Sequence, residues 1–232
     1  REGKVGMGGY FYNDRNGLIE RSGFQYAYSY HIFLKGSNEI SLGLALTAFQ
    51  FKLDRDNVRA TTPNDPVLYS QASKTIFVPD ASFGAYWLNR QFYAGISVVQ
   101  LSQSLLKLGN NAFDDYQLYR HYYLTGGYYL HLDGYYTLMP SILMRSTENL
   151  KTFQSDLSMR LIYKKTVWAG ITYRTNHDIV AVLGCKFGRF NITYAFDYPP
   201  NPIRQHSLGS HELTLSMILG DTERRYRWLD RY

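Results

Sequence analysis

The alternation in residues 23–34, which read GFQYAYSYHIFL, decides the fold. One set of alternate positions is apolar or aromatic: Phe24, Tyr26, Tyr28, Tyr30, Ile32 and Leu34. The positions between them are small or polar: Gly23, Gln25, Ala27, Ser29 and His31. A helix would mix the two sets on one surface, whereas a strand points them to opposite faces. The stretch therefore predicts a β-strand with one apolar face and one polar face.

The same period of two recurs along the chain. It predicts about twelve strands, with expected bounds at 4–12, 20–34, 39–53, 79–88, 91–99, 117–131, 135–145, 153–164, 167–175, 178–187, 189–198 and 211–220. No segment with a helical period competes with them, and no linker divides the chain. We therefore expect an all-β protein with one domain over residues 1–220, followed by a basic C-terminal tail over residues 221–232.

The connections between these strands alternate between short and long. The short ones have the composition of hairpin turns and lie at 35–38, 89–90, 132–134, 164–166 and 188–189. The long ones lie at 13–19, 54–78, 100–116, 146–152 and 199–210, with one tight member at 176–177. All the longest loops therefore leave one end of an up-and-down meander. This asymmetry is typical of outer-membrane β-barrels, whereas soluble sandwiches use Greek-key crossings and have no reason for it.

The composition excludes several classes of protein. Of 232 residues, 22 are Tyr, 13 are Phe and 3 are Trp, which favours strands and boundaries between water and an apolar phase. Cys185 is the single cysteine, so an internal disulfide and a multi-cysteine zinc site are excluded. Apolar runs stay well short of the roughly 18 residues that a membrane helix needs. The formal net charge of +6 comes mostly from scattered basic residues, which argues against nucleic-acid binding.

The apolar face of the strands has to meet either a protein core or lipid. We expect lipid, because the opposite face is rich in Gly, Ser and Thr with isolated charges, as suits a wet or plugged lumen. Aromatic residues at the strand ends resemble the girdles of membrane barrels; they are Tyr10, Phe24, Tyr135, Phe153, Tyr163, Tyr173, Phe190 and Tyr198. The sequence therefore predicts a transmembrane up-and-down antiparallel β-barrel. It should be closed, since an open edge in hydrocarbon leaves backbone groups unsatisfied.

Five charged residues in the last strands are expected on the lumen side: Asp156, Arg160, Arg174, Asp197 and Glu212. Two interpretations of this set remain open. The residues form salt bridges within the wall of the lumen, or they bind a polypeptide inside it. In a confined lumen such charges are poorly screened, so each lost pair would weaken binding.

Signatures of catalysis and of cofactor binding are missing from the sequence. The six histidines show no zinc spacing and no HExxH motif, and no nucleotide-binding or G-x-S-x-G motif occurs. Ser210, His211 and Glu212 cannot form a triad, because neighbours in a strand point to opposite faces. We therefore expect no enzyme, no cofactor and no metal ion.

Segments spread along the chain resemble the PorP/SprF family. They are GYFYNDRNG at 9–17, FQYAYSYH at 24–31, FVPDASFG at 77–84, YAGIS at 93–97, HYYLTGGY at 121–128, WAGITYRT at 168–175, and DY at 197–198 followed by GSHE at 209–212. Each segment alone is weakly specific, but together they occur in the family's order. The resemblance covers nearly all of the chain up to about residue 220.

This resemblance implies a non-enzymatic outer-membrane β-barrel of the type IX secretion and gliding-motility apparatus. Its partners would be a secreted adhesin or that adhesin's C-terminal domain, other components of the apparatus on the periplasmic side, and membrane lipid. Family chains begin with a further segment that is missing here. About two strands would fit in that segment, which would give about fourteen in a complete barrel.

A second class of function stays open, namely an outer-membrane porin or a hydrophobic-solute transporter. A general porin would be expected to have a strongly polar lumen, whereas Gly, Ser, Thr and Tyr prevail on this one. In either case, the parity of the loops predicts that the loop 54–78 faces the outside and that the turn 89–90 faces the periplasm.

Overall fold

The structure is a computed structural model that describes residues 4–17, 19–53, 74–107, 115–148, 152–198 and 209–219. Most of the loop 54–78 and the whole tail 221–232 lie outside these residues. The described strands are β1 (Val5–Asn16), β2 (Ile19–Phe33), β3 (Glu39–Leu53), β4 (Lys74–Leu88), β5 (Phe92–Val99), β6 (Leu105–Lys107), β7 (Asp115–Gln117), β8 (His121–Tyr128), β9 (Leu130–His131), β10 (Tyr136–Thr147), β11 (Phe153–Tyr163), β12 (Val167–Arg174), β13 (Ile179–Phe187), β14 (Phe190–Tyr198) and β15 (Ser210–Met217).

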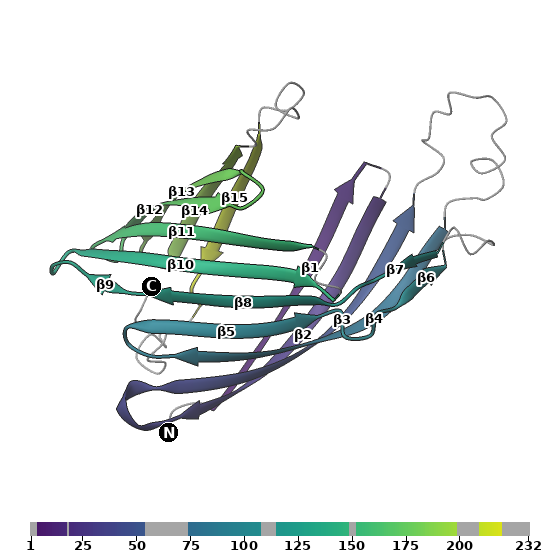
Figure 1. The fold of residues 1–232 in the computed structure, drawn as a ribbon, viewed down its shortest axis with the longest axis horizontal. Helices are drawn as coiled ribbons and strands as arrows, with labels where there is room; N and C mark the ends of the chain where they lie inside the picture. The colour runs from purple at the N-terminus through teal and green to yellow at the C-terminus, as the bar shows by residue number, and fades with distance from the viewer. Residues whose placement is uncertain are drawn as a thin grey trace.

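Thirteen of these strands form one antiparallel sheet. They pair in the order of the chain from β1 to β15, with β9 beside β10 and with β6 and β7 set apart as a small hairpin (Figure 1). The predicted all-β meander is therefore confirmed. The main differences lie in the connections: β4 begins at Lys74 rather than at 79, and β6 and β7 lie largely within the predicted loop 100–116.

The sheet is irregular beside Pro140, and the irregularity lies mainly in the neighbouring strand. β10 continues through Pro140 and keeps its register with β11, where Pro140 is opposite Met159. On the other side, the partner strand is interrupted at Tyr129, between β8 and β9. Proline has no backbone N–H to donate, so the ladder cannot be regular where it faces this residue.

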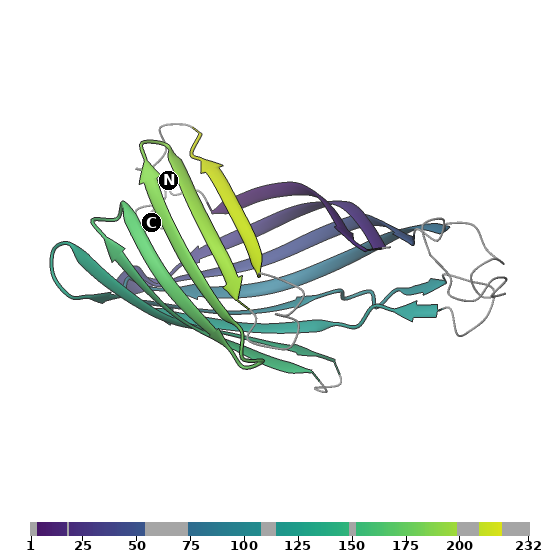
Figure 2. The same ribbon diagram turned by 90° about the horizontal axis from the view of Figure 1, so that it is seen from above.

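The prediction of a closed barrel is not met. The sheet is an open trough, whose free edges are β1 and β15 among the described strands (Figure 2). Alternation and turn length specify which neighbours pair, and this part of the prediction succeeded. Closure depends also on strand number, tilt and shear being mutually consistent, and no single hairpin encodes these quantities.

The trough has one apolar face and one polar face. In β2, the exposed positions are the aromatic and aliphatic ones predicted from the alternation, and the polar positions between them are less exposed. In β11, β12 and β13, exposed and less exposed positions alternate in the same way. Large apolar side chains on the convex face include Tyr28, Leu44, Ile96, Leu124, Leu157, Ile171, Leu183, Ile192 and Leu213, and all are exposed. This face is therefore a continuous apolar surface without a protein layer over it among the described residues.

On the concave face, aromatic rings lie across glycines of the neighbouring strand. Four such pairs stand directly opposite each other in register: Tyr12 and Gly23, Tyr86 and Gly95, Tyr93 and Gly127, Trp168 and Gly184. A methyl group added at any of these glycines would meet the ring of its partner. Each ring therefore lies flat against the wall, which keeps the interior of the trough open and fixes the register.

A small hydrophobic core packs against the inner wall near the long-loop end of β2 to β4. Phe49, Phe51, Val78 and Leu118 are buried there, with Tyr12, Ile19 and Ile76 packed against them. Leu118 precedes β8 and its backbone N–H donates to the carbonyl of Ser104. Because the Leu118 side chain is buried in this core, the connection between β5 and β8 is fastened to the inner wall.

Candidate functional site

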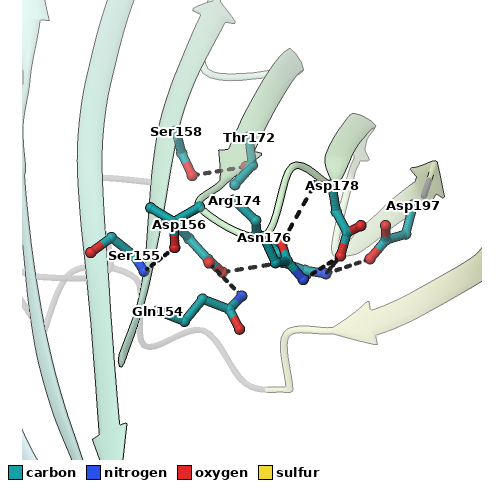
Figure 3. Close-up of polar contacts among 10 residues, drawn as sticks. Gln154, Ser155, Asp156, Ser158, Thr172, Arg174, Asn176, Asp178 and Asp197 are labelled. Carbon is teal, nitrogen blue, oxygen red and sulfur yellow. Dashed lines mark hydrogen bonds and ion pairs between the residues drawn. The ribbon is translucent and has the colours of Figure 1, made fainter. Parts of the chain in front are cut away.

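The acidic and basic residues of the last strands meet on the concave face around Arg174. Asp156 of β11 stands directly opposite Arg174 of β12 in the register of the sheet. Arg174 is the last residue of its strand, so its guanidinium extends past the turn to Asp197 of β14. Alternation, pairing and the end of a strand together place the three side chains in one cluster (Figure 3).

The distances describe one cation among three carboxylates. Arg174 Nε lies 3.4 Å from Asp156 Oδ2, and Nη1 donates to Asp197 Oδ2 at 2.5 Å. Nη1 also lies 4.0 Å from Asp178 Oδ2. Asp156 is buried, whereas Arg174, Asp178 and Asp197 keep partial access to the interior of the trough. The four side chains therefore carry a formal net negative charge, and they retain accessible carboxylate oxygens.

Hydrogen bonds hold this cluster in place from both sides. The Gln154 side-chain amide donates to Asp156 Oδ1 at 2.9 Å, and Asn176 Nδ2 donates to Asp178 Oδ2 at 2.6 Å. Two residues further along the same strands, the hydroxyl oxygens of Ser158 and Thr172 lie 2.8 Å apart across β11 and β12 (Figure 3). The first two contacts hold the Asp156 and Asp178 carboxylates in place.

Three of the five residues proposed from the sequence therefore come together: Asp156, Arg174 and Asp197. Arg160 lies elsewhere on the same face, opposite Gly170, where it lines a cavity of about 270 Å³. Glu212 is exposed on the edge strand β15 and accepts a hydrogen bond from Thr214 at 3.4 Å.

Asp178 was missed in the sequence as a member of this cluster. It lies four residues after Arg174, across the tight connection 176–177 that the sequence did predict. The short spacing between Arg174 and Asp178 across a tight turn was the feature of the sequence from which their proximity could have been predicted.

The other half of the trough holds a larger cavity of about 740 Å³. Its floor is a row of small residues that lie opposite each other on five successive strands: Gly6, Ser29, Gly43, Gly84 and Ser97. A second row, shifted along the strands, contains Gly8, Ala27, Ala45 and Ser82. Because these positions carry almost no side chain, the inner surface is hollowed across β1 to β5.

A polar network lines one side of this cavity, and it too was missed in the sequence. His31 Nδ1 lies 2.9 Å from Glu39 Oε1 and 2.7 Å from Ser41 Oγ, while Nε2 lies 3.2 Å from Ser29 Oγ. Glu39 is buried. The signal was available in the alternation, because Ser29 and His31 share the polar face of β2, and a short turn brings Glu39 and Ser41 alongside them. The network links β2 to β3 and presents a histidine–carboxylate pair to the cavity.

Comparison with known proteins identifies the type of molecule. The family model described as "Type IX secretion system membrane protein PorP/SprF" matches residues 1–217. No curated protein matches the chain. Within the described residues, no helix has the length and apolar character needed to cross a membrane.

Proposed function

The chain belongs to the PorP/SprF family of type IX secretion system membrane proteins, and on this premise we propose that it helps to secrete or anchor a large cell-surface adhesin. In this proposal the protein is non-enzymatic and integral to the outer membrane. It binds the C-terminal domain of the adhesin on its concave face or at its long-loop end. The short-turn end meets other components of the secretion apparatus in the periplasm.

The membrane placement is supported by the exposed convex face. Tyr28, Leu44 and Leu183 are 41%, 50% and 60% exposed, and many similar side chains surround them. An apolar surface that runs across a whole sheet is far larger than the patches that monomeric soluble proteins expose. In the proposed location, lipid acyl chains cover this apolar surface, and no further layer of protein is needed.

The free edges of β1 and β15 set a condition on this placement. In hydrocarbon, an unpaired strand edge leaves backbone N–H and C=O groups without hydrogen bonds. The proposal therefore requires that additional strands or a protein partner cover both edges in the membrane. Lipid contact then remains confined to the convex face.

Partner binding is supported by the Arg174 cluster, which is the single observation that carries this part of the proposal. Asp156, Asp178 and Asp197 surround one cation, so the cluster holds more negative charge than it neutralises. Basic side chains of a polypeptide in the trough could pair with the accessible oxygens. Such pairs are stronger where the surrounding wall excludes water.

The experiment compares cells that lack the gene with cells that carry variants of it. Deletion should remove the adhesin from the cell surface. A variant with Asp178→Asn and Asp197→Asn should lower the surface level of the adhesin while the variant protein itself is present in normal amounts. Glu20→Gln on β2 is a control for the loss of a carboxylate at the same end of the sheet, because Glu20 lies outside the cluster and pairs only weakly with Lys52 at 3.9 Å. Normal amounts of attached adhesin after deletion would show that the proposal is wrong.

A porin or a hydrophobic-solute transporter is the alternative function. The cavity of about 740 Å³ favours it, because its floor of small residues offers space for an apolar solute. Single-channel recording separates the two functions: a porin gives stable conductance in the absence of adhesin, whereas an adaptor does not. Uptake of an apolar solute, lost together with this gene, would favour the transporter.

A further inference from the structure

The short-turn end of the sheet carries an excess of basic side chains. In the described turns these are Lys35, Arg90, Lys164, Lys165 and Arg189, and all five are exposed. The acidic residue among these turns is Asp133, whose carboxylate accepts hydrogen bonds from the backbone N–H groups of Tyr135 and Tyr136, both at 2.7 Å. The described turns at this end therefore carry more positive than negative charge, and the Asp133 carboxylate is engaged within its own turn.

The basic side chains are densest where two turns adjoin. Lys164 and Lys165 form the turn between β11 and β12, and Arg189 lies in the turn between β13 and β14. The backbone N–H of Lys186, near the end of β13, donates to the carbonyl of Thr166 at 2.6 Å, which ties the two turns together. We call Lys164, Lys165 and Arg189 the basic turn patch.

Exposed aromatic rings at the short-turn end lie against this patch. The Lys164 ammonium nitrogen lies 5.0 Å from the ring centre of Tyr135 and 5.2 Å from that of Tyr163, both exposed residues. Phe187 and Phe190 flank the turn of Arg189 and are 80% and 44% exposed. The apolar surface therefore ends in aromatic rings, and positive charge follows directly beyond them.

The order of apolar surface, aromatic rings and basic side chains along the strands matches the order of acyl chains, interface and headgroups in a phospholipid leaflet. Acyl chains meet aliphatic side chains, aromatic rings prefer the interface, and basic side chains meet phosphate. We propose that the basic turn patch binds the phosphate-bearing headgroups of anionic lipids in the leaflet at the short-turn end. An acidic protein surface would fit the charges equally well, but it would leave the 80% exposed ring of Phe187 without an apolar partner.

The inference rests on the proposed contact between the convex face and lipid, and it is independent of the adhesin. The test is native mass spectrometry of the purified protein in mild detergent, titrated with phosphatidylglycerol or with zwitterionic phosphatidylethanolamine. The patch variant carries Lys164→Gln, Lys165→Gln and Arg189→Gln. A control variant carries Arg15→Gln, Lys52→Gln and Arg145→Gln, which remove an equal number of positive charges at the opposite end of the strands. Far-UV circular dichroism and thermal unfolding establish that both variants keep their fold.

Wild-type protein should retain phosphatidylglycerol in preference to phosphatidylethanolamine. The patch variant should bind phosphatidylglycerol roughly tenfold more weakly, because a basic residue near an anionic lipid surface contributes about fivefold and the three act partly in common. The control variant should bind as wild type does. Equal retention of both lipids by wild type, an equal loss in the control variant, or displacement of lipid by the same concentration of inorganic phosphate would overturn the proposal. Unchanged lipid binding in the patch variant, with loss of a co-purifying protein, would assign the patch to a protein partner instead.

Discussion

Tyr28 and Ala27 are neighbours in β2 that face opposite sides of the sheet. Tyr28 is 41% exposed on the convex face, whereas Ala27 lines the cavity on the concave face. If the convex face contacts lipid, Tyr28→Arg should lower the free energy of unfolding by about 2–4 kcal/mol, and Ala27→Arg by much less. Denaturant unfolding of the protein in lipid vesicles measures both. The sequence alone predicts the same contrast between Tyr28 and Ser29.

Ala27 is the better control because Ser29 lies close to His31 and within 3.4 Å of the carbonyl of Gly6. A substitution at Ser29 would break these contacts, whatever solvent surrounds the wall. Equal losses of stability at Tyr28 and Ala27 would mean that both faces meet the same medium, and the lipid assignment would then be wrong.

The sequence predicted which face each charged residue occupies, but it predicted only part of their grouping. Asp156 and Arg174 occupy register positions that alternation predicts, so their proximity was accessible from the sequence. Their contact with Asp178 depends on how the short connection after β12 turns, and contact with Asp197 depends on the length of the Arg174 side chain past the strand end. The network around His31 likewise requires the exact pairing of β2 with β3, because a slip of one residue would send Ser41 to the other face.

At the scale of a strand pair, the aromatic–glycine contacts yield a separate prediction. Gly184→Ala in β13 would place a methyl group against the indole ring of Trp168, so the ring must leave the wall. We expect a loss of about 1–3 kcal/mol in the free energy of unfolding and a shift in Trp168 fluorescence. Denaturant unfolding and emission spectra measure these quantities.

Gly43→Ala is the matched control. Its added methyl group would be 3.9 Å from the nearest atoms, the carbonyl oxygens of Gly84 and Tyr28, which is ordinary contact. It should therefore change stability far less than Gly184→Ala does. If both variants unfold alike and the tryptophan emission stays constant, then the ring does not depend on this glycine.

The strand pattern was predictable because each strand shows its period locally. The bounds of β3 agree with the prediction at both ends, and β11 to β14 agree within one residue. β4 was predicted too short, since it runs through Pro79, which pairs with Ala48 inside the sheet. The open trough does not follow from local alternation, because closure depends on how the whole sheet curves. The added hairpin does not follow from it either, because β6 and β7 have 3 residues each, too few to show a period.

Across the whole molecule, chemistry differs between the two halves of the concave wall and between the two ends of the strands. β1 to β5 present small residues over a cavity of about 740 Å³, whereas β11 to β14 present the Arg174 cluster. The cluster lies at the long-loop end, and the basic turn patch lies at the short-turn end. The concave wall is therefore chemically different at its two ends and in its two halves, and a polypeptide bound there as proposed would have one favoured orientation.

The orientation of the molecule in the membrane is the last prediction. The short turns that join β2 to β3, β4 to β5, β9 to β10, β11 to β12 and β13 to β14 all lie at one end of the sheet. The loop 54–78 leaves the other end, where the tight connection 176–177 also lies. If the long loops face outside, trypsin added to whole cells should cut after Arg55 or Arg59 and should spare Arg90, although Arg90 is exposed in its turn. Permeabilised cells, in which the protease reaches the periplasm, are the control, and there both regions should be cut. Peptide mass spectrometry identifies the products. Cleavage at Arg90 in intact cells, with residues 54–73 spared, would reverse the topology and would place the basic turn patch in the outer leaflet.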